Sequence, residues 1–227
     1  MVKPADIEAL KQLALLGGLD GHVELASGEF SDLIQASQQT ASRRLIELTK
    51  ENLIQREMGV RKQRIRITED GRAVLRAEHF LYQQLFERRD HIRLRGRVRT
   101  GLGEGRYYLS RPGYQKQFED HLGWTAYPGT LNLELNGAEA NKLRFLRRNP
   151  VHVIEGFQAE GRTFGGVNCH PAEVQGQACA AILPHRSHYT TTIELIAPVC
   201  LREMLPCQDD DELEVTVHLN RPRDPDA

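Results

Sequence analysis

The sequence predicts an α+β chain of two domains, and three observations support this. Its 227 residues are enough for one large domain or two small ones. Residues 1–88 place apolar residues at helical spacing, whereas residues 89–227 consist mostly of short alternating runs typical of strands. Gly, Pro and Asn separate those runs. We therefore expect a mostly helical domain over 1–88 and a compact six-stranded β-barrel over 89–227.

Composition narrows the class of protein. Hydrophobic residues make up 40% and charged residues 27% of the chain, with a formal net charge of −1, which is ordinary for a soluble globular protein. No apolar run reaches membrane-spanning length, and the N-terminus lacks an apolar signal core, so we expect a cytoplasmic protein. The four cysteines form no C-x-x-C pair, which favours reduced thiols over a zinc site or disulfides.

The first 88 residues predict a winged helix-turn-helix. IEALKQLALLGGL and SGEFSDLIQA read as two helices, and Ser37 is placed to cap a third whose apolar stripe is Ala41, Leu45 and Leu48. LIQRE and QRIRIT then alternate like two strands joined by the tip MGVRK. EDGRAVLRAEHFLYQQLFE reads as a last helix.

The third helix and the hairpin tip carry residues suited to double-stranded DNA. Gln38, Gln39 and Thr40 lie in the first turn, where a helix-turn-helix presents side chains to base edges. Phosphate contacts are expected from Arg43, Arg44, Arg61 and Lys62. Residues 37–66 hold eight basic and three acidic residues, a local balance of +5. The alternatives are a docking or dimerisation module, or ordinary solvated charge. A homodimer is compatible with DNA binding, although 69–87 shows no coiled-coil heptad.

The second half contains the glycine-rich stretch GLGEGRYYLS at 101–110. It lacks the Lys-Ser/Thr of a P-loop and the spacing of a dinucleotide-binding turn. On its own it is compatible with a plain hairpin between strands RGRVRTG and RYYLS. Further strands are expected at TLNLEL, VHVIEGFQ, CAAILP, TTIELIAPV and ELEVTVHL, with helices at PGYQKQFEDHLG and AEANKLRFLRR.

Three motifs in order give the glycine loop a context. They are G-x-G-E-G followed by aromatics, P-G-T-L-N-L at 128–133, and E-L-I-A-P-V-x-L-R at 194–202. With these motifs, residues 95–219 resemble the archaeal CTP-dependent riboflavin kinases, some of which also carry an N-terminal winged helix. The resemblance implies a β-barrel kinase that transfers the γ-phosphate of CTP to the 5′-hydroxyl of riboflavin, giving FMN and CDP.

The resemblance also implies site residues. Nucleotide contacts fall on Gly101, Leu102, Gly103, Glu104, Gly105, Arg106, Val199, Cys200, Leu201 and Arg202. Thr130 and Asn132 would bind Mg²⁺, and Ser187 and Glu194 would contact the flavin.

The residue chemistry is compatible with these roles. Thr130 and Asn132 share one face of a strand, where two neutral oxygens suit Mg²⁺ together with phosphates and waters. Glu194 stands in an apolar strand and is our candidate general base. Arg106 and Arg202 are candidate phosphate contacts in place of a P-loop lysine. The structural alternatives are that Thr130 and Asn132 bond a neighbouring turn and that both arginines are surface charge. Tyr107, Tyr108 and Trp124 are more typical of a core.

Three functions remain open on the sequence. The first is a flavin kinase with a DNA-binding domain. The second is a transcription regulator whose barrel senses flavin or nucleotide without catalysis, and the third is a barrel that serves only as an interaction module. Neither H-R-D nor D-F-G occurs, so a protein kinase is set aside.

Overall fold

The computed structural model describes residues 2–59, 62–87, 89–101, 103–137, 139–186 and 191–220. The chain divides into two compact units, Met1–Phe86 and Glu87–Ala227. In the part of the chain that the structure describes, no helix is long and apolar enough to cross a membrane.

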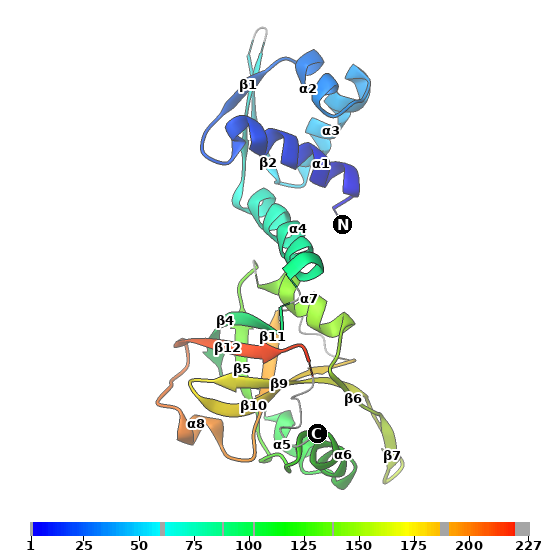
Figure 1. Cartoon of the computed structure of the whole chain (residues 1–227), viewed down its shortest axis with the longest axis vertical. Helices are drawn as coiled ribbons and strands as arrows, with labels where there is room; N and C mark the ends of the chain where they lie inside the picture. Colours follow the sequence, from blue (N-terminus) through cyan, green and yellow to red (C-terminus); the bar gives the residue numbers. More distant parts are fainter. Residues whose placement is uncertain are drawn as a thin grey trace. The chain divides into compact units, whose positions relative to one another are not determined.

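Unit 1 is a winged helix. Its elements are α1 (Pro4–Leu13), the π-helical turn η1 (Ala14–Gly18), β1 (Val23–Leu25), α2 (Ser27–Leu33), α3 (Gln38–Lys50), β2 (Ile54–Met58), β3 (Gln63–Ile67) and α4 (Glu69–Glu87) (Figure 1). The predicted hairpin is present as β2 and β3, with Ile54 opposite Ile67. The short strand β1 was not predicted; it pairs with β3, so the sheet has the order β1-β3-β2.

One apolar core holds unit 1 together. Leu10 and Leu13 of α1, Leu45 of α3 and Ile65 of β3 are fully buried in it. At about 25 cal/mol per Å² of buried apolar area, such side chains each contribute roughly 1.5–3 kcal/mol. Because α3 packs through one stripe only, its opposite side stays in solvent.

Unit 2 is a closed six-stranded barrel with helices on its outside. Its strands are β4 (His91–Arg99), β5 (Leu131–Leu135), β6 (His152–Ile154), β7 (Phe157–Ala159), β8 (Arg162–Phe164), β9 (Val167–Val174), β10 (Gln177–Pro184), β11 (Thr192–Ile196) and β12 (Glu212–His218). Its helices are α5 (Glu104–Leu109), α6 (Pro112–Leu122), α7 (Ala140–Arg148) and α8 (Leu201–Met204) (Figure 1). The order β10-β11-β5-β4-β12-β9 closes because β9 also pairs with β10, and β6 extends the sheet beside β9.

Strand alternation places two different environments on the two faces of the barrel wall. Leu131 and Leu133 are buried inside, opposite Leu195 and Ile193 of β11. Asn132 between them therefore faces outward. A second apolar cluster, including Tyr114, Phe118, Phe164 and Ile182, lies outside the barrel beneath α5 and α6. The outer face of β5, β11 and β10 is thus half covered, which suits a ligand site.

Three strand expectations need correction. RYYLS was expected as a strand, but residues 104–109 form α5, which starts after Gly103 at φ +81° and buries Leu109. VHVIEGFQ is two strands, β6 and β7. The strand of the E-L-I-A-P-V-x-L-R motif ends at Ile196, and Leu201 begins the short helix α8. The eight-residue strand β9 was missed, because Pro171 and His170 weaken its strand pattern.

Candidate functional site

The glycine loop lies directly over the start of β5. A Cβ atom at Gly101 would stand 2.2 Å from Nδ2 of Asn132, and one at Gly105 would stand 3.0 Å from Oγ1 of Thr130. A larger residue at 101 would therefore require the loop or the Asn132 amide to shift. The loop is not a hairpin between two strands: it runs from the end of β4 into α5 and covers the two predicted metal ligands.

Asn132 has an acceptor without a partner. Its Oδ1 is buried and has no hydrogen bond within the part of the chain that the structure describes. A buried polar atom of this kind costs about 1–3 kcal/mol unless something binds it. Nearby Thr130 supplies a second neutral oxygen. Such a donor set suits Mg²⁺ when phosphates and waters complete the octahedron. The described residues contain no cluster of three His, Cys, Asp or Glu side chains able to hold a metal alone.

Glu194 stands beside this pair. It lies directly opposite Asn132 in the β11–β5 ladder, so the two side chains share the outer face. Burial raises the pKa of Glu194; the charge of Arg147 acts against that rise, and the charge of Glu104 adds to it. The Glu194 carboxylate thus lies within electrostatic reach of the Arg147 guanidinium and of the Glu104 carboxylate at the start of α5.

Arg147 is a site residue that the sequence did not reveal. It lies in the last turn of α7, and its Nη1 donates a hydrogen bond to the carbonyl oxygen of Pro184 at 3.0 Å. Its own carbonyl accepts a hydrogen bond from Nδ2 of Asn168 at 2.7 Å. Burial lowers the pKa of Arg147, and the charge of Glu194 opposes this. Nothing in the run RFLRR separates this arginine from its exposed neighbours Arg144 and Arg148.

Arg202 contacts the chain just before the glycine loop. Its Nη2 donates to the carbonyl oxygen of Arg99 at 2.8 Å and pairs with Oδ1 of Asp209 at 2.9 Å. Oδ2 of Asp209 accepts a hydrogen bond from the Thr100 amide at 3.0 Å. Arg202 therefore braces the end of β4. As a phosphate contact it would act with part of its guanidinium already bonded.

The predicted nucleotide segment 199–202 and the predicted metal ligand Thr130 meet at one pocket. A cavity of about 70 Å³ is lined by Tyr127, Gly129 and Thr130 on one side and by Val199–Arg202 on the other. Cys200 and Leu201 are the cap and first residue of α8. Glu104 and Arg106 lie in α5 with exposed side chains, and Leu102 lies outside the described residues.

A larger hollow lies farther along the outer face. It has a volume of about 500 Å³ and is lined by Phe157, Phe164, Gly165, His185 and Arg186 among others. The rings of Phe157 and Phe164 are stacked, with centroids 4.9 Å apart. Ser187, the predicted flavin contact, follows Arg186 directly but lies outside the described residues. Tyr107 and Tyr108 are partly exposed beside Phe164, whereas Trp124 packs against the outer apolar cluster.

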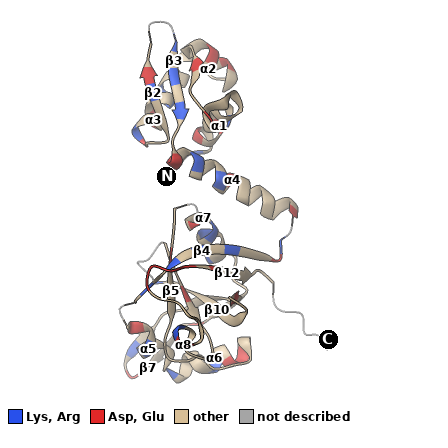
Figure 2. Ribbon diagram, turned by 90° about the vertical axis from the view of Figure 1, so that its left-hand side faces the viewer, with Lys and Arg blue, Asp and Glu red and all other residues tan. Residues whose placement is uncertain are grey.

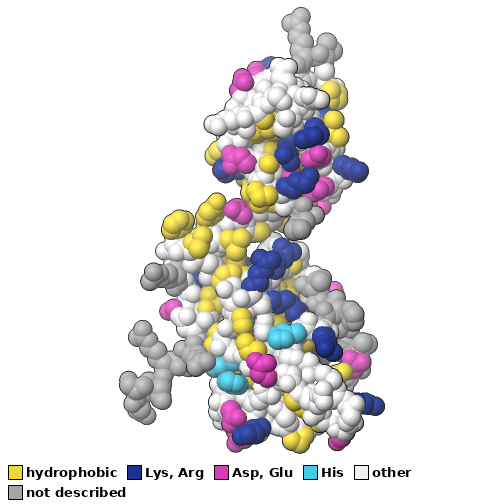
Figure 3. Space-filling view, turned by 90° about the vertical axis from the view of Figure 1, so that its right-hand side faces the viewer, with side chains coloured by type: hydrophobic (Ala, Val, Ile, Leu, Met, Phe, Trp, Pro, Cys, Tyr) yellow, Lys and Arg dark blue, Asp and Glu magenta, His cyan; other side chains and the backbone are white. Residues whose placement is uncertain are grey.

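In unit 1, the predicted DNA contacts separate into two groups. Gln38, Gln39 and Arg43 are exposed on α3, and Lys62 is exposed near the hairpin tip, 3.4 Å from Glu29. Arg61 lies outside the described residues. On the face of unit 1 seen in Figure 3, basic, acidic and exposed hydrophobic side chains are interspersed.

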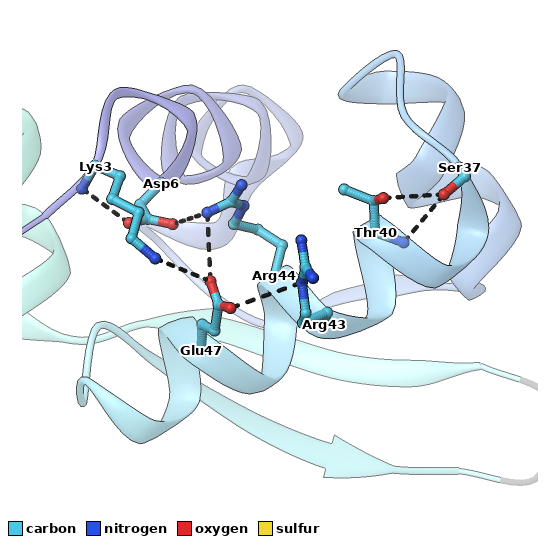
Figure 4. Close-up of polar contacts among 7 residues, drawn as sticks. All are labelled: Lys3, Asp6, Ser37, Thr40, Arg43, Arg44 and Glu47. Atoms are coloured by element: carbon cyan, nitrogen blue, oxygen red, sulfur yellow. Dashed lines mark hydrogen bonds and ion pairs between the residues drawn. The ribbon is translucent and has the colours of Figure 1, made fainter.

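Arg44 and Thr40 are instead engaged within the unit. Arg44 points toward α1, where its Nη1 lies 2.5 Å from Oδ1 of the buried Asp6 (Figure 4). The expected phosphate contact by Arg44 is therefore replaced by a brace between α1 and α3. Ser37 accepts a hydrogen bond from the Thr40 amide at 3.2 Å, the predicted helix cap, and its hydroxyl donates to Oγ1 of Thr40.

Comparison with known proteins decides the family. The model of the CTP-dependent riboflavin kinase family, described as domain of unknown function DUF120, matches residues 98–217. The chain belongs to the CTP-dependent riboflavin kinase family. It is 44% identical to the riboflavin kinase of Methanoregula boonei over 222 residues, which is 96% of this chain and 99% of that protein. The Methanosarcina mazei riboflavin kinase is 43% identical over 92% of this chain and 93% of its own length.

The family model matches unit 2 alone, whereas full-length relatives align with both units. The family model spans Thr130, Asn132, Glu194 and Arg202, all in unit 2. The Methanoregula riboflavin kinase aligns over almost the whole chain, so it shares unit 1 as well. The crystal structure of MepR, a transcription regulator of a Staphylococcus aureus efflux pump, aligns with 38% of this chain and 62% of its own, at a TM-score of 0.33 and 20% identity. That likeness is too low to support an argument about unit 1.

Proposed function

We propose that this member of the family is a riboflavin kinase that transfers the γ-phosphate of CTP to the 5′-hydroxyl of riboflavin. The observation that carries the proposal is the buried Oδ1 of Asn132, which has no hydrogen-bond partner among the described residues, lies on the strand residue opposite Glu194, and belongs to a side chain that Gly101 of the glycine loop approaches closely. Phosphoryl transfer asks a protein mainly for positioning and charge neutralisation. This arrangement supplies the positioning, and a bound Mg²⁺ together with Arg202 would supply the charge neutralisation without a P-loop lysine.

Each residue would have one task. Backbone N–H groups of the glycine loop bind the phosphates, and Thr130 and Asn132 hold Mg²⁺. The metal, when bound, supplies charge neutralisation on the phosphate oxygens. Glu194 accepts the proton of the 5′-hydroxyl. The hydroxyl oxygen bonds to the γ-phosphorus while the bond from that phosphorus to the β–γ bridging oxygen breaks, giving FMN and CDP.

The two cavities suggest where the substrates lie. We assign the pocket between Tyr127 and Val199 to the CTP side, because it adjoins Thr130 and residues 199–202. We assign the hollow beside Phe157 and Phe164 to the isoalloxazine ring, because stacked aromatic rings suit a flat heterocycle. Glu194 lies on the outer face of the barrel, opposite Ile182 of β10. The chain continues from β10 to His185, which lines the larger hollow.

The test is FMN formation from riboflavin and Mg²⁺ with CTP, ATP, GTP or UTP, followed by chromatography. We expect turnover with CTP, its loss on chelation of Mg²⁺, and a loss of about 10- to 100-fold or more in Asn132→Ala. Glu194→Gln should lose about 100-fold or more, while Glu173→Gln, an exposed carboxylate on β9, serves as the matched control. Saturable flavin binding without FMN from any nucleotide would instead identify a sensor.

We further propose that unit 1 binds double-stranded DNA. Exposed Gln38, Gln39 and Arg43 on α3 favour it, together with the local excess of basic residues. Affinity for a random duplex should fall with salt, and Arg43→Ala should reduce the slope of log K against log salt by about 1. A salt slope unchanged by this variant would remove Arg43 from the interface. A homodimer stays a prediction, which light scattering of the full chain tests.

A further inference from the structure

An isoleucine lies exposed on the helix that we propose to enter DNA. Ile46 of α3 has 57% of its surface exposed. The partly buried apolar residues that pack against the core of unit 1 do not include it, as far as the structure describes them. A large apolar side chain that stays exposed contributes little to the stability of the fold, which suggests that it contacts a binding partner.

Helical geometry places Ile46 on the outward stripe of α3. Gln39, Arg43, Ile46 and Lys50 follow one another at intervals of four, three and four residues, and all are exposed. The buried stripe, Ala41, Leu45 and Leu48, lies on the opposite side of the helix. Ile46 therefore lies on an exposed face of α3, between Arg43 and Lys50 and on the side away from the buried stripe.

Charge makes this stripe suitable for a nucleic acid. It carries Arg43 and Lys50 and no carboxylate, because Glu47, the single acid of α3, is turned aside. Glu47 lies 3.4 Å from Arg44 and 3.8 Å from Lys3, on the side of α1 (Figure 4). Its 3.8 Å contact with the exposed Arg43 is a surface pair worth little. The stripe thus combines two cations, one amide and one branched apolar group.

That combination fits the edges of base pairs in a major groove. An amide can bond adenine at N6 and N7, cations can meet phosphates, and the C5 methyl of thymine is the apolar group on a base edge. We infer that Ile46 reads sequence by contacting the C5 methyl of a thymine in double-stranded DNA. This inference rests on the proposed DNA binding and is independent of the kinase reaction.

The experiment removes the methyl group from the DNA and the side chain from the protein separately. The full chain first selects duplexes from a random-sequence DNA pool. Each thymine of a selected duplex is then replaced by deoxyuridine, which pairs identically but lacks the C5 methyl. At one thymine, or its symmetric pair, we expect binding to weaken about fourfold per contact, from about 0.8 kcal/mol for one methyl group.

The variant decides the assignment. Ile46→Ala should weaken binding to the thymine duplex and lose the discrimination between thymine and deoxyuridine at that position. Leu15→Ala, another exposed aliphatic residue of unit 1, is the control and should keep it. Unchanged discrimination in Ile46→Ala would overturn the inference. Enrichment of no duplex would overturn sequence reading by α3 and with it this inference. Absence of binding to any duplex would overturn DNA binding itself, while FMN formation by the same preparation would still report on the kinase.

Discussion

At the scale of single residues, the charge of Arg147 beside Glu194 sets the pH range in which that carboxylate can accept a proton. Burial raises the pKa of Glu194, and Arg147 holds it lower than burial alone would. Arg147→Gln should therefore raise this pKa further, so that the acid limb of the kcat–pH profile moves to higher pH. Arg144→Gln, on the exposed side of α7, is the control. An acid limb at the same pH in both variants would contradict this role.

Gly101 gives a second prediction at this scale. A methyl group there meets Nδ2 of Asn132 at 2.2 Å, so Gly101→Ala must displace the loop or the amide. Because a misplacement of about 1 Å can cost about 100-fold in rate, we expect a loss of that order in FMN formation. Gly137→Ala, where a Cβ meets nothing within 4 Å, should leave the rate near that of the parent. Equal rates in the two variants would show that the loop need not lie against β5.

At the scale of elements, the contact between α1 and α3 depends on Asp6 and Arg44. Asp6 is 3% exposed and also accepts a hydrogen bond from the Lys3 amide at 2.9 Å. Removing one partner of a buried pair costs about 3–5 kcal/mol when the other charge is left uncompensated, but Glu47, 3.4 Å from Arg44, still balances part of that charge. We therefore expect Asp6→Ala to lower the free energy of unfolding of unit 1 by about 1–3 kcal/mol in urea titrations. The control is Arg43→Ala, because Arg43 is exposed; this variant should change the free energy of unfolding by less than about 0.5 kcal/mol. A similar loss in both variants would show that the Asp6–Arg44 pair has no particular role in stability.

The helices and strands also show which secondary structure could be predicted from sequence patterns. Long periodic segments such as 38–50 and 69–87 were predicted as helices because their apolar residues repeat at 3.6 positions. Short segments were ambiguous. RYYLS alternates like a strand, yet a glycine at positive φ and the burial of Leu109 make it a helix. β1 has three residues, and only its pairing with β3 makes it a strand.

At the scale of the whole molecule, the two units have separate apolar cores. Substitutions in one unit should therefore leave the other's activity intact. Asn132→Ala should lower FMN formation by about 10- to 100-fold or more and retain DNA affinity, whereas Arg43→Ala should weaken DNA binding and retain FMN formation. Both activities are measured on the same full-length preparations. If either variant impairs both activities in soluble, folded protein, the functions are coupled.

By itself the sequence predicted the two-part organisation and most of the winged-helix elements, because periodicity is a local property of the chain, and the family resemblance of its motifs pointed to Thr130, Asn132 and Glu194. Only the tertiary structure decided that Gly101 lies against Asn132, that Glu194 stands opposite it, and that Arg147 and Asp209 belong to the same neighbourhood. It also turned Arg44 from a predicted DNA contact into an internal brace. These contacts join residues 31 to 109 positions apart in the sequence. No local sequence pattern predicts them, because they form only when the strands of the barrel pair and the helices of each unit pack.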